Sequence, residues 1–136
     1  MFSDTCNFEF CVKRLWRDYE KHANLIIAFD FDNTIYDYHN EGYHFDCVKS
    51  LLRDCTELGF TMVLFTANDD PDTLRHHIEF CEGEGIRVDF VNESPVLKTT
   101  KPYYNILLDD RAGLEDAYHI LSQVVKRIKN ERLCKQ

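Results

Sequence analysis

Apolar residues recur along the chain with two spacings, one typical of helices and one typical of buried strands. Residues 25–29, Leu-Ile-Ile-Ala-Phe, form a continuous apolar run of strand length. Residues 60–65, 86–91 and 105–108 are predicted to form three more strands. A strand that is apolar on both faces is typical of the centre of a parallel sheet that is covered on both sides. Four short strands in one parallel sheet are therefore predicted.

Between these strands, apolar residues three and four positions apart predict amphipathic helices. The predicted helices are residues 7–21, 45–58, 71–81 and 114–133. Strands that alternate with helices across short connections predict an α/β fold, a three-layer α/β/α Rossmann-like sandwich with right-handed crossovers. Ligands of such sheets bind beyond the carboxyl ends of the strands, so the chemistry is expected there.

The chain has 136 residues, no internal repeat and no linker, which predicts a single domain over residues 1–136. Residues 1–24 form a helical extension that precedes the first strand of the sheet. Its apolar side chains Phe8, Leu15 and Trp16 must be buried, and packing within the domain is favoured over a dimer contact.

Composition narrows the classes of partner. Lys and Arg total 16 against 24 Asp and Glu, giving a net charge of -8, which disfavours binding to nucleic acids and to anionic membranes. No apolar run is long enough to cross a bilayer, and the first residues carry no secretory signal. The six cysteines include no C-x-x-C pair, so we expect reduced, mostly buried thiols in a cytoplasmic protein.

Two pairs of aspartates follow predicted strands. Asp30 and Asp32 end the first strand, and Asp109 and Asp110 end the fourth. Single aspartates at such positions are commonly helix caps or turn residues. If the two strands are neighbours, however, up to four carboxylates converge, and a cation or a proton must offset their repulsion. Hard oxygen ligands of this kind suit Mg²⁺.

These residues carry a resemblance to a known family. Phe29-Asp30-Phe31-Asp32-Asn33-Thr34 resembles the D-x-D-x-T signature of haloacid dehalogenase-like (HAD) phosphohydrolases. Thr66, after the second strand, and Leu107-Leu108-Asp109-Asp110 resemble the threonine/serine and acidic motifs of that superfamily. The match covers residues 25–113 in the expected order, and it implies an HAD-like core.

The resemblance implies a role for each motif residue. Asp30 would attack phosphorus and form an aspartyl-phosphate, and Asp32 would protonate the leaving alcohol and then activate water. Mg²⁺ would be held by Asp30, by Asp109 and by the backbone carbonyl of Asp32. Asp110 would either orient one of these ligands or bind the ion through a water molecule. Thr66 would donate a hydrogen bond to a phosphoryl oxygen.

The family also has a lysine that contacts the phosphoryl group, and Lys98 and Lys101 are the two candidates for it here. Relatives commonly place a helix between this lysine and the acidic strand, yet only seven residues separate Lys101 from Asp109. Lys98 lies closer in sequence to the end of the third strand at Asn92, which favours it. Lys101 has the Lys-Pro pairing that is often seen in relatives. A third alternative is that both lysines are solvated loop residues.

The family usually gains selectivity from inserted cap domains, yet the first gap holds only a loop, residues 35–44. The chain therefore resembles a member without a large cap, whose open site is compatible with a homo-oligomer. Aromatic and imidazole side chains crowd this loop, and they either contact a leaving group or pack the loop; they are Tyr36, Tyr38, His39, Tyr43 and His44.

Outside the loop of residues 35–44, His76 and His77 are expected to face solvent. Arg111 is expected to form an ion pair rather than to approach phosphate.

The function that the resemblance implies is Mg²⁺-dependent hydrolysis of a small phosphate ester, a nucleotide or a phosphosugar, by a cytoplasmic phosphatase. A polynucleotide-end phosphatase is an alternative that the acidic charge disfavours. A catalytically weak or inactive binding or assembly module is another. A phospho-acceptor receiver domain would place its motifs in a different order.

Overall fold

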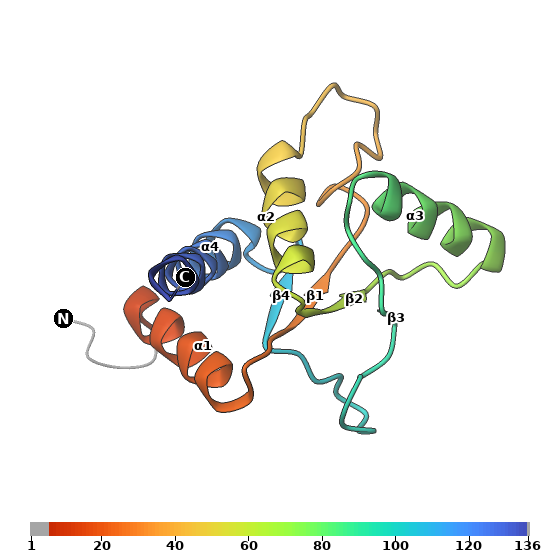
Figure 1. Cartoon of the computed structure of the whole chain (residues 1–136). Coiled ribbons are helices and arrows are strands. Elements are labelled where there is room, and N and C mark those ends of the chain that lie inside the picture. The colour runs from red at the N-terminus through yellow and green to blue at the C-terminus, as the bar shows by residue number, and fades with distance from the viewer. Residues whose placement is uncertain (1–5, 136) are drawn as a thin grey trace.

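Four parallel strands form a single sheet at the centre of the computed structural model, which describes residues 6–135 (Figure 1). The strands are β1 (Ile26–Phe29), β2 (Thr61–Leu64), β3 (Phe90–Val91) and β4 (Ile106–Leu108), in the spatial order β3-β2-β1-β4. The helices are α1 (Phe8–His22), α2 (Asp46–Glu57), α3 (Pro71–Gly83) and α4 (Leu114–Cys134). The predicted α/β sandwich with a short parallel sheet is confirmed. Residues 1–5 of the expected extension, and residue 136, lie outside the described part.

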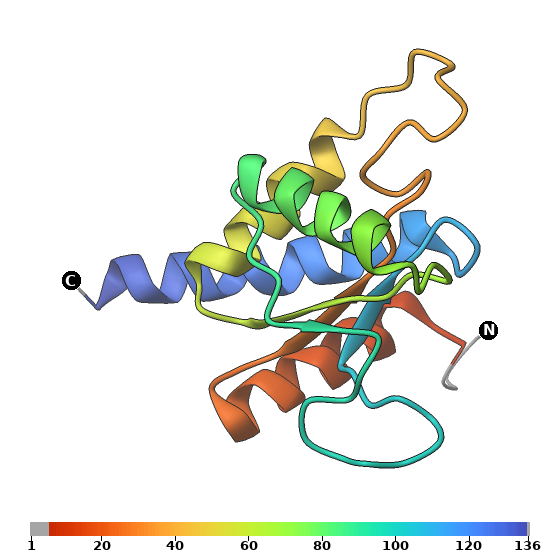
Figure 2. The same ribbon diagram turned by 90° about the vertical axis from the view of Figure 1, so that its right-hand side faces the viewer.

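The two faces of the sheet are covered differently. Alternate strand residues such as Ile27 and Phe29 point into a large apolar cluster to which all four helices contribute. On the opposite face, Ile26 and Ala28 belong to a smaller cluster with strand and loop residues. The connection between β3 and β4 contains no helix, and it lies on the side of the sheet away from α2 and α3 (Figure 2). Its aromatic side chains form the cover on this face.

Local capping signals set the bounds of α2 and α3. The Asp70 carboxylate accepts the Thr73 N–H at 3.0 Å, and Pro71 occupies the first turn of α3. Gly59 follows α2 with a φ of 84°, a left-handed conformation that glycine adopts without steric cost. These residues explain why α2 ends and α3 begins where they do.

The third strand is shorter than the predicted residues 86–91, since only Phe90 and Val91 pair with β2. Side chains, together with one backbone hydrogen bond from the Asp89 N–H to the Met62 carbonyl at 2.9 Å, hold the preceding segment. The Arg87 guanidinium donates to the Thr56 carbonyl at 3.1 Å, and the Asp89 carboxylate accepts the Met62 N–H at 2.8 Å. The alternating apolar residues Ile86 and Val88 reflect packing of an irregular segment on the core rather than a longer strand.

Helix α1 packs against α4 of the same chain, on the β4 side of the sheet (Figure 1). Leu15 and Trp16 are buried as expected. The Arg127 guanidinium of α4 lies 3.8 Å from the centre of the Trp16 ring, a cation–π contact between the two helices. Phe8, in contrast, is 39% exposed, so its predicted burial is wrong: it lies in the first turn of α1 and is not part of the core.

Cys11, Cys47, Cys55, Cys81 and Cys134 are free cysteines. Only Cys55 and Cys81 are buried, while three others are exposed and Cys11 is partly covered. The expectation of mostly buried thiols is therefore wrong, because α2 and α4 each turn a cysteine outward. In the described part of the chain, no helix is long and apolar enough to cross a membrane.

A buried amide side chain joins the start of β1 to the start of β4. Asn105 is 7% exposed, and its Oδ1 accepts the Ile26 N–H at 2.6 Å. Its Nδ2 donates to Asp18 of α1 at 3.1 Å, and Arg14 of α1 donates to the Asn105 carbonyl at 2.9 Å. One side chain thus ties the sheet to α1.

We predict that Asn105→Ala lowers the free energy of unfolding by about 1 to 3 kcal/mol, because the Ile26 N–H loses its partner in a buried place. Urea denaturation of the purified variant measures this loss. Asn130→Ala, a change at an exposed position of α4, is the matched control and should stay within about 0.5 kcal/mol of the native protein. Equal stability of the two variants would contradict the assigned role of Asn105.

Candidate active site

Parallel pairing aligns the carboxyl ends of the strands along one edge of the sheet. The Asp30 N–H donates to the Leu108 carbonyl at 2.9 Å, which continues the pairing of β1 with β4. On the other side of β1, the Phe65 N–H donates to the Phe29 carbonyl at 2.8 Å. The residues that follow β1, β2 and β4 therefore meet at the same edge, as the strand order requires.

Three carboxylates converge at this edge. Asp30, Asp109 and Asp110 each offer an oxygen, and these atoms all lie within 4.8 Å of one another. Asp32 lies in the same cleft, but its side chain is not part of this group of three. The structure thus brings Asp30 together with Asp109 and Asp110, while the Asp32 carboxylate lies outside this cluster.

A buried hydroxyl connects the two aspartate pairs. Thr34 has no exposed surface; its Oγ1 donates to Asp30 Oδ2 at 3.2 Å and accepts the Asp110 N–H at 3.1 Å. This hydroxyl therefore fixes the Asp30 carboxylate relative to the loop after β4. The sequence motif contains Thr34, but its spacing alone does not reveal this double contact.

The environment makes Asp30 hard to ionise. Burial is the main cause, and the nearby charge of Asp109 adds to it, so that the pKa of Asp30 is raised from 3.8 to about 6. Hydrogen bonds from the Phe31 backbone and from Thr34 act in the opposite direction, and the contact with Asp110 raises the pKa further. The carboxylate cluster is therefore electrostatically strained when no cation is bound.

Aromatic side chains support the turn that carries Asp30 and Asp32. The ring of Phe31, between them, stacks on His77 of α3 with centroids 3.8 Å apart. His77 is half-buried, which corrects the expectation that it faces solvent; α3 turns it toward this turn, and only His76 is exposed. Burial lowers the pKa of His77, while the charge of Asp32 opposes this shift. His77 therefore supports the turn from the side of α3.

An open cleft of about 870 Å³ surrounds the carboxylates, a size that admits a small ligand. It is lined by residues from the ends of the four strands and from the loop after β1, including Asp30, Asp32, Tyr38, His39, Thr66, Asn92, Asp109, Asp110 and Arg111. Arg111 is the only lysine or arginine among the lining residues. It forms no ion pair with any described residue, contrary to the expectation that it pairs with an acid.

Neither lysine candidate is among the residues that line the cleft. The Lys98 Nζ donates to the Ser94 carbonyl at 3.2 Å, and its side chain is 76% exposed. Lys101 is exposed as well, although Pro102 beside it reaches the cleft. The reason is the path of the connection from β3 to β4, which passes over the second face of the sheet instead of staying at the carboxyl edge (Figure 2).

Polar groups from β2 and β3 complete the edge. The Thr66 N–H donates to the Asn92 side chain at 2.8 Å, and the Thr66 hydroxyl accepts the Asn68 N–H at 3.3 Å. Among the described residues, none accepts the hydroxyl proton of Thr66, so this proton remains free for a ligand. Asn92 adopts a left-handed φ of 53°, which an asparagine after a strand tolerates well. Its role in holding Thr66 is not visible in the sequence pattern.

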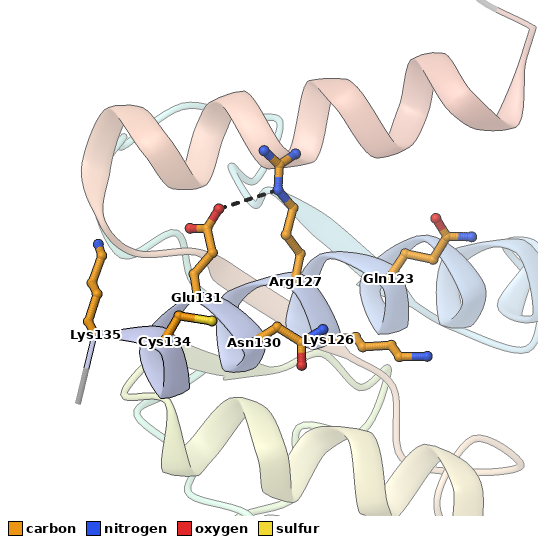
Figure 3. Close-up of a pocket in the computed structure, with 7 residues that line it drawn as sticks. All are labelled: Gln123, Lys126, Arg127, Asn130, Glu131, Cys134 and Lys135. Atoms are coloured by element: carbon orange, nitrogen blue, oxygen red, sulfur yellow. Dashed lines mark ion pairs between the residues drawn. The ribbon is translucent and has the colours of Figure 1, made fainter.

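A second hollow, of about 650 Å³, lies on the carboxyl-terminal half of α4 (Figure 3). All its lining residues come from that one helix and its end. Its acid, Glu131, forms an ion pair with Arg127 at 3.6 Å. The aspartates, the threonine and the free arginine gather elsewhere, so we assign the chemistry to the carboxyl edge of the sheet.

Comparison with known proteins supports the fold. No family model matches the sequence, and no curated protein matches it. Among solved structures, the chain is similar to a conserved protein from Bacteroides thetaiotaomicron, with a TM-score of 0.60 and 22% sequence identity. The similarity covers 76% of this chain and 91% of that protein. At this identity the likeness concerns the α/β fold and not the chemistry of the site.

We predict a pH-dependent stability effect at Asp30. Because its pKa is near 6 in the folded protein and near 3.8 in the unfolded chain, the folded state binds a proton more tightly. This contribution to stability is largely present at pH 4 and is lost as the pH rises through about 6. Between pH 4 and pH 7.5, in EDTA, the stability of Asp30→Asn relative to the native protein should therefore increase by about 1 to 2 kcal/mol, allowing for partial solvent screening.

Denaturant titrations at the two pH values measure this change. Asp69→Asn, at an exposed position of the same cleft, is the control for the substitution itself. A constant difference between Asp30→Asn and the native protein at both pH values would contradict the strain assigned to Asp30.

Proposed function

We propose that this protein is a Mg²⁺-dependent phosphomonoesterase of the HAD-like type that acts through an aspartyl-phosphate on a small phosphate ester. The observation that carries the proposal is the convergence of Asp30, Asp109 and Asp110 within 4.8 Å at the carboxyl edge of the sheet. Asp32 and Thr66 line the same open cleft. The order of these residues along the chain agrees with the motifs of that superfamily.

The donor set fits a hard divalent cation. Carboxylate oxygens are the ligands that Mg²⁺ prefers, and three of them at this separation repel one another unless positive charge is added. Asp30, Asp109 and Asp110 are the side chains that would hold the ion. When bound, Mg²⁺ supplies positive charge that neutralises the phosphoryl oxygens and favours the ionised form of Asp30.

The residues of the chain divide the reaction into two displacements. Thr34 restrains Oδ2 of Asp30, and we assign the attack on phosphorus to Oδ1. A phosphorus–Oδ1 bond forms as the bond from phosphorus to the leaving oxygen breaks, and Asp32 gives its proton to that oxygen. Asp32 then takes a proton from water, whose oxygen attacks phosphorus and releases inorganic phosphate and the free Asp30 carboxylate.

Arg111 contacts the phosphoryl group, a role that the resemblance assigns to a lysine. Arg111 lines the cleft and forms no ion pair with any described residue, whereas Lys98 and Lys101 do not line it. A guanidinium can donate two parallel hydrogen bonds to phosphoryl oxygens. Together with the free hydroxyl proton of Thr66, it would hold the phosphoryl group in the cleft.

A catalytically inactive binding module is the second candidate. The observation that favours it is the position of both lysines outside the cleft, since the resemblance leads us to expect one of them there. Such a module would bind phosphate esters and Mg²⁺ without releasing phosphate. Measurements of turnover and of binding separate the two candidates.

We predict that phosphate release from small phosphate esters requires both Mg²⁺ and Asp30. Asp30→Asn removes the nucleophile at nearly constant volume, so turnover should fall by about three orders of magnitude or more, while circular dichroism remains native-like. Asp69→Asn, at an exposed position of the cleft, serves as the matched carboxylate control. EDTA should abolish release by the native protein.

Turnover that survives in Asp30→Asn would contradict the aspartyl-phosphate mechanism. Absence of release from every ester tested, together with saturable Mg²⁺ binding by calorimetry, would favour the binding module instead.

We also predict that Arg111→Met lowers kcat/KM about 10- to 100-fold, because it removes a charge-assisted contact with the phosphoryl group. Arg75→Met, which removes an exposed arginine of α3 that does not line the cleft, should leave kcat/KM within twofold. Steady-state kinetics with one phosphate ester measures both. A larger loss in Lys98→Met or Lys101→Met than in Arg111→Met would return the role to a lysine.

A further inference from the structure

We infer that the cleft selects phosphate esters whose alcohol carries a planar ring, with nucleoside 5′-monophosphates as the substrate class, and that Tyr38 and His39 form the surface on which the ring stacks. This inference rests on the proposed phosphatase function. It decides between the two classes of small ester, nucleotides and phosphosugars, that the sequence leaves open.

The ring of Tyr38 is presented to the cleft and not to the protein core. Tyr38 is 60% exposed, although it lines the same cleft as Asp30 and Asp32. Its ring contact is with His39, at a centroid distance of 5.0 Å and an interplanar angle of 77°. Among the described residues, none forms a hydrogen bond with the Tyr38 hydroxyl. One aromatic face is therefore available to a ligand.

The loop that carries this pair is ordered before any ligand arrives. The Asp37 carboxylate accepts the Glu41 N–H at 3.1 Å and the Gly42 N–H at 2.7 Å, and the Asp37 carbonyl accepts the Asn40 N–H at 3.1 Å. These bonds close a tight turn around residues 38–39. A surface that is fixed in advance loses little conformational entropy when a ring stacks on it.

The base of the loop is anchored beside the proposed acid. Tyr36 stacks on Phe31 with centroids 5.2 Å apart and meets Phe80 of α3 edge-on at 5.4 Å. The Asn33 N–H donates to the Tyr36 carbonyl at 2.8 Å, and Asp32 and Tyr36 form an isolated β-bridge. The aromatic pair that follows is thus held near Asp32, which protonates the leaving oxygen. The alcohol part of the ester must leave on this side.

Charge and size restrict the ester further. Five aspartates line the cleft against a single arginine, so every phosphate beyond the one at the metal site is repelled. This disfavours nucleoside triphosphates and polynucleotide ends relative to monophosphates. The cleft of about 870 Å³ has room for a nucleoside. A flat aromatic face makes a stronger stacking contact with a planar base than with a sugar alone.

The test compares adenosine 5′-monophosphate with ribose 5-phosphate, which has the same sugar and phosphate but no base. The native protein should show a kcat/KM ratio of about tenfold or more in favour of the nucleotide, the range expected for one stacked base. In Tyr38→Leu this ratio should fall about tenfold. In Tyr43→Leu, an exposed tyrosine of the same loop outside the cleft lining, the ratio should be that of the native protein.

A native ratio near one, or an equal fall for both esters in Tyr38→Leu, overturns the inference while the phosphatase proposal stands. A higher kcat/KM for a 5′-phosphorylated oligonucleotide than for the mononucleotide also overturns it. If neither ester is hydrolysed, the phosphatase proposal fails, and calorimetric binding to the native protein decides the inference separately. Tighter binding of the nucleotide that is lost in Tyr38→Leu supports the stacking surface, and equal binding of both esters, or of neither, overturns it.

Discussion

The parallel pairing of β1 with β4 is the constraint on which the structure depends. It places the two most polar strand ends of the chain side by side, and the hydrogen bond from the Asp30 N–H to the Leu108 carbonyl sets their register. The same pairing that completes the apolar centre therefore crowds Asp30 and Asp109 together. The raised pKa of Asp30 is the electrostatic consequence of this crowding and of burial. The crowded carboxylate edge is thus kept at the expense of some stability.

Much of the fold is predictable from the sequence because its signals are local. A continuous apolar run such as residues 25–29 has few alternatives to a central strand, and Asp70 followed by Pro71 marks a helix start through backbone hydrogen bonding and a fixed φ. The convergence of Asp30 with Asp109 and Asp110 was predictable as well, on the condition that β1 and β4 are neighbours. The strand order meets that condition.

The remaining features depend on contacts between distant segments, which the local pattern does not encode. The third strand is short because Arg87 and Asp89 bind neighbouring segments through their side chains. Lys98 and Lys101 lie outside the cleft because the connection that carries them crosses the second face of the sheet. His77 packs on the turn after β1 because α3 approaches it from a direction that helical periodicity alone does not give.

The lengths of the two edge strands have a consequence for association between molecules. β3 contains two residues and β4 contains three, so each edge of the sheet offers very few unpaired backbone groups. Long, flat edge strands act as templates for the addition of strands from other chains, and short ones do not. The sheet is thereby protected against edge-to-edge aggregation, and self-association of this protein would have to use its helices and loops.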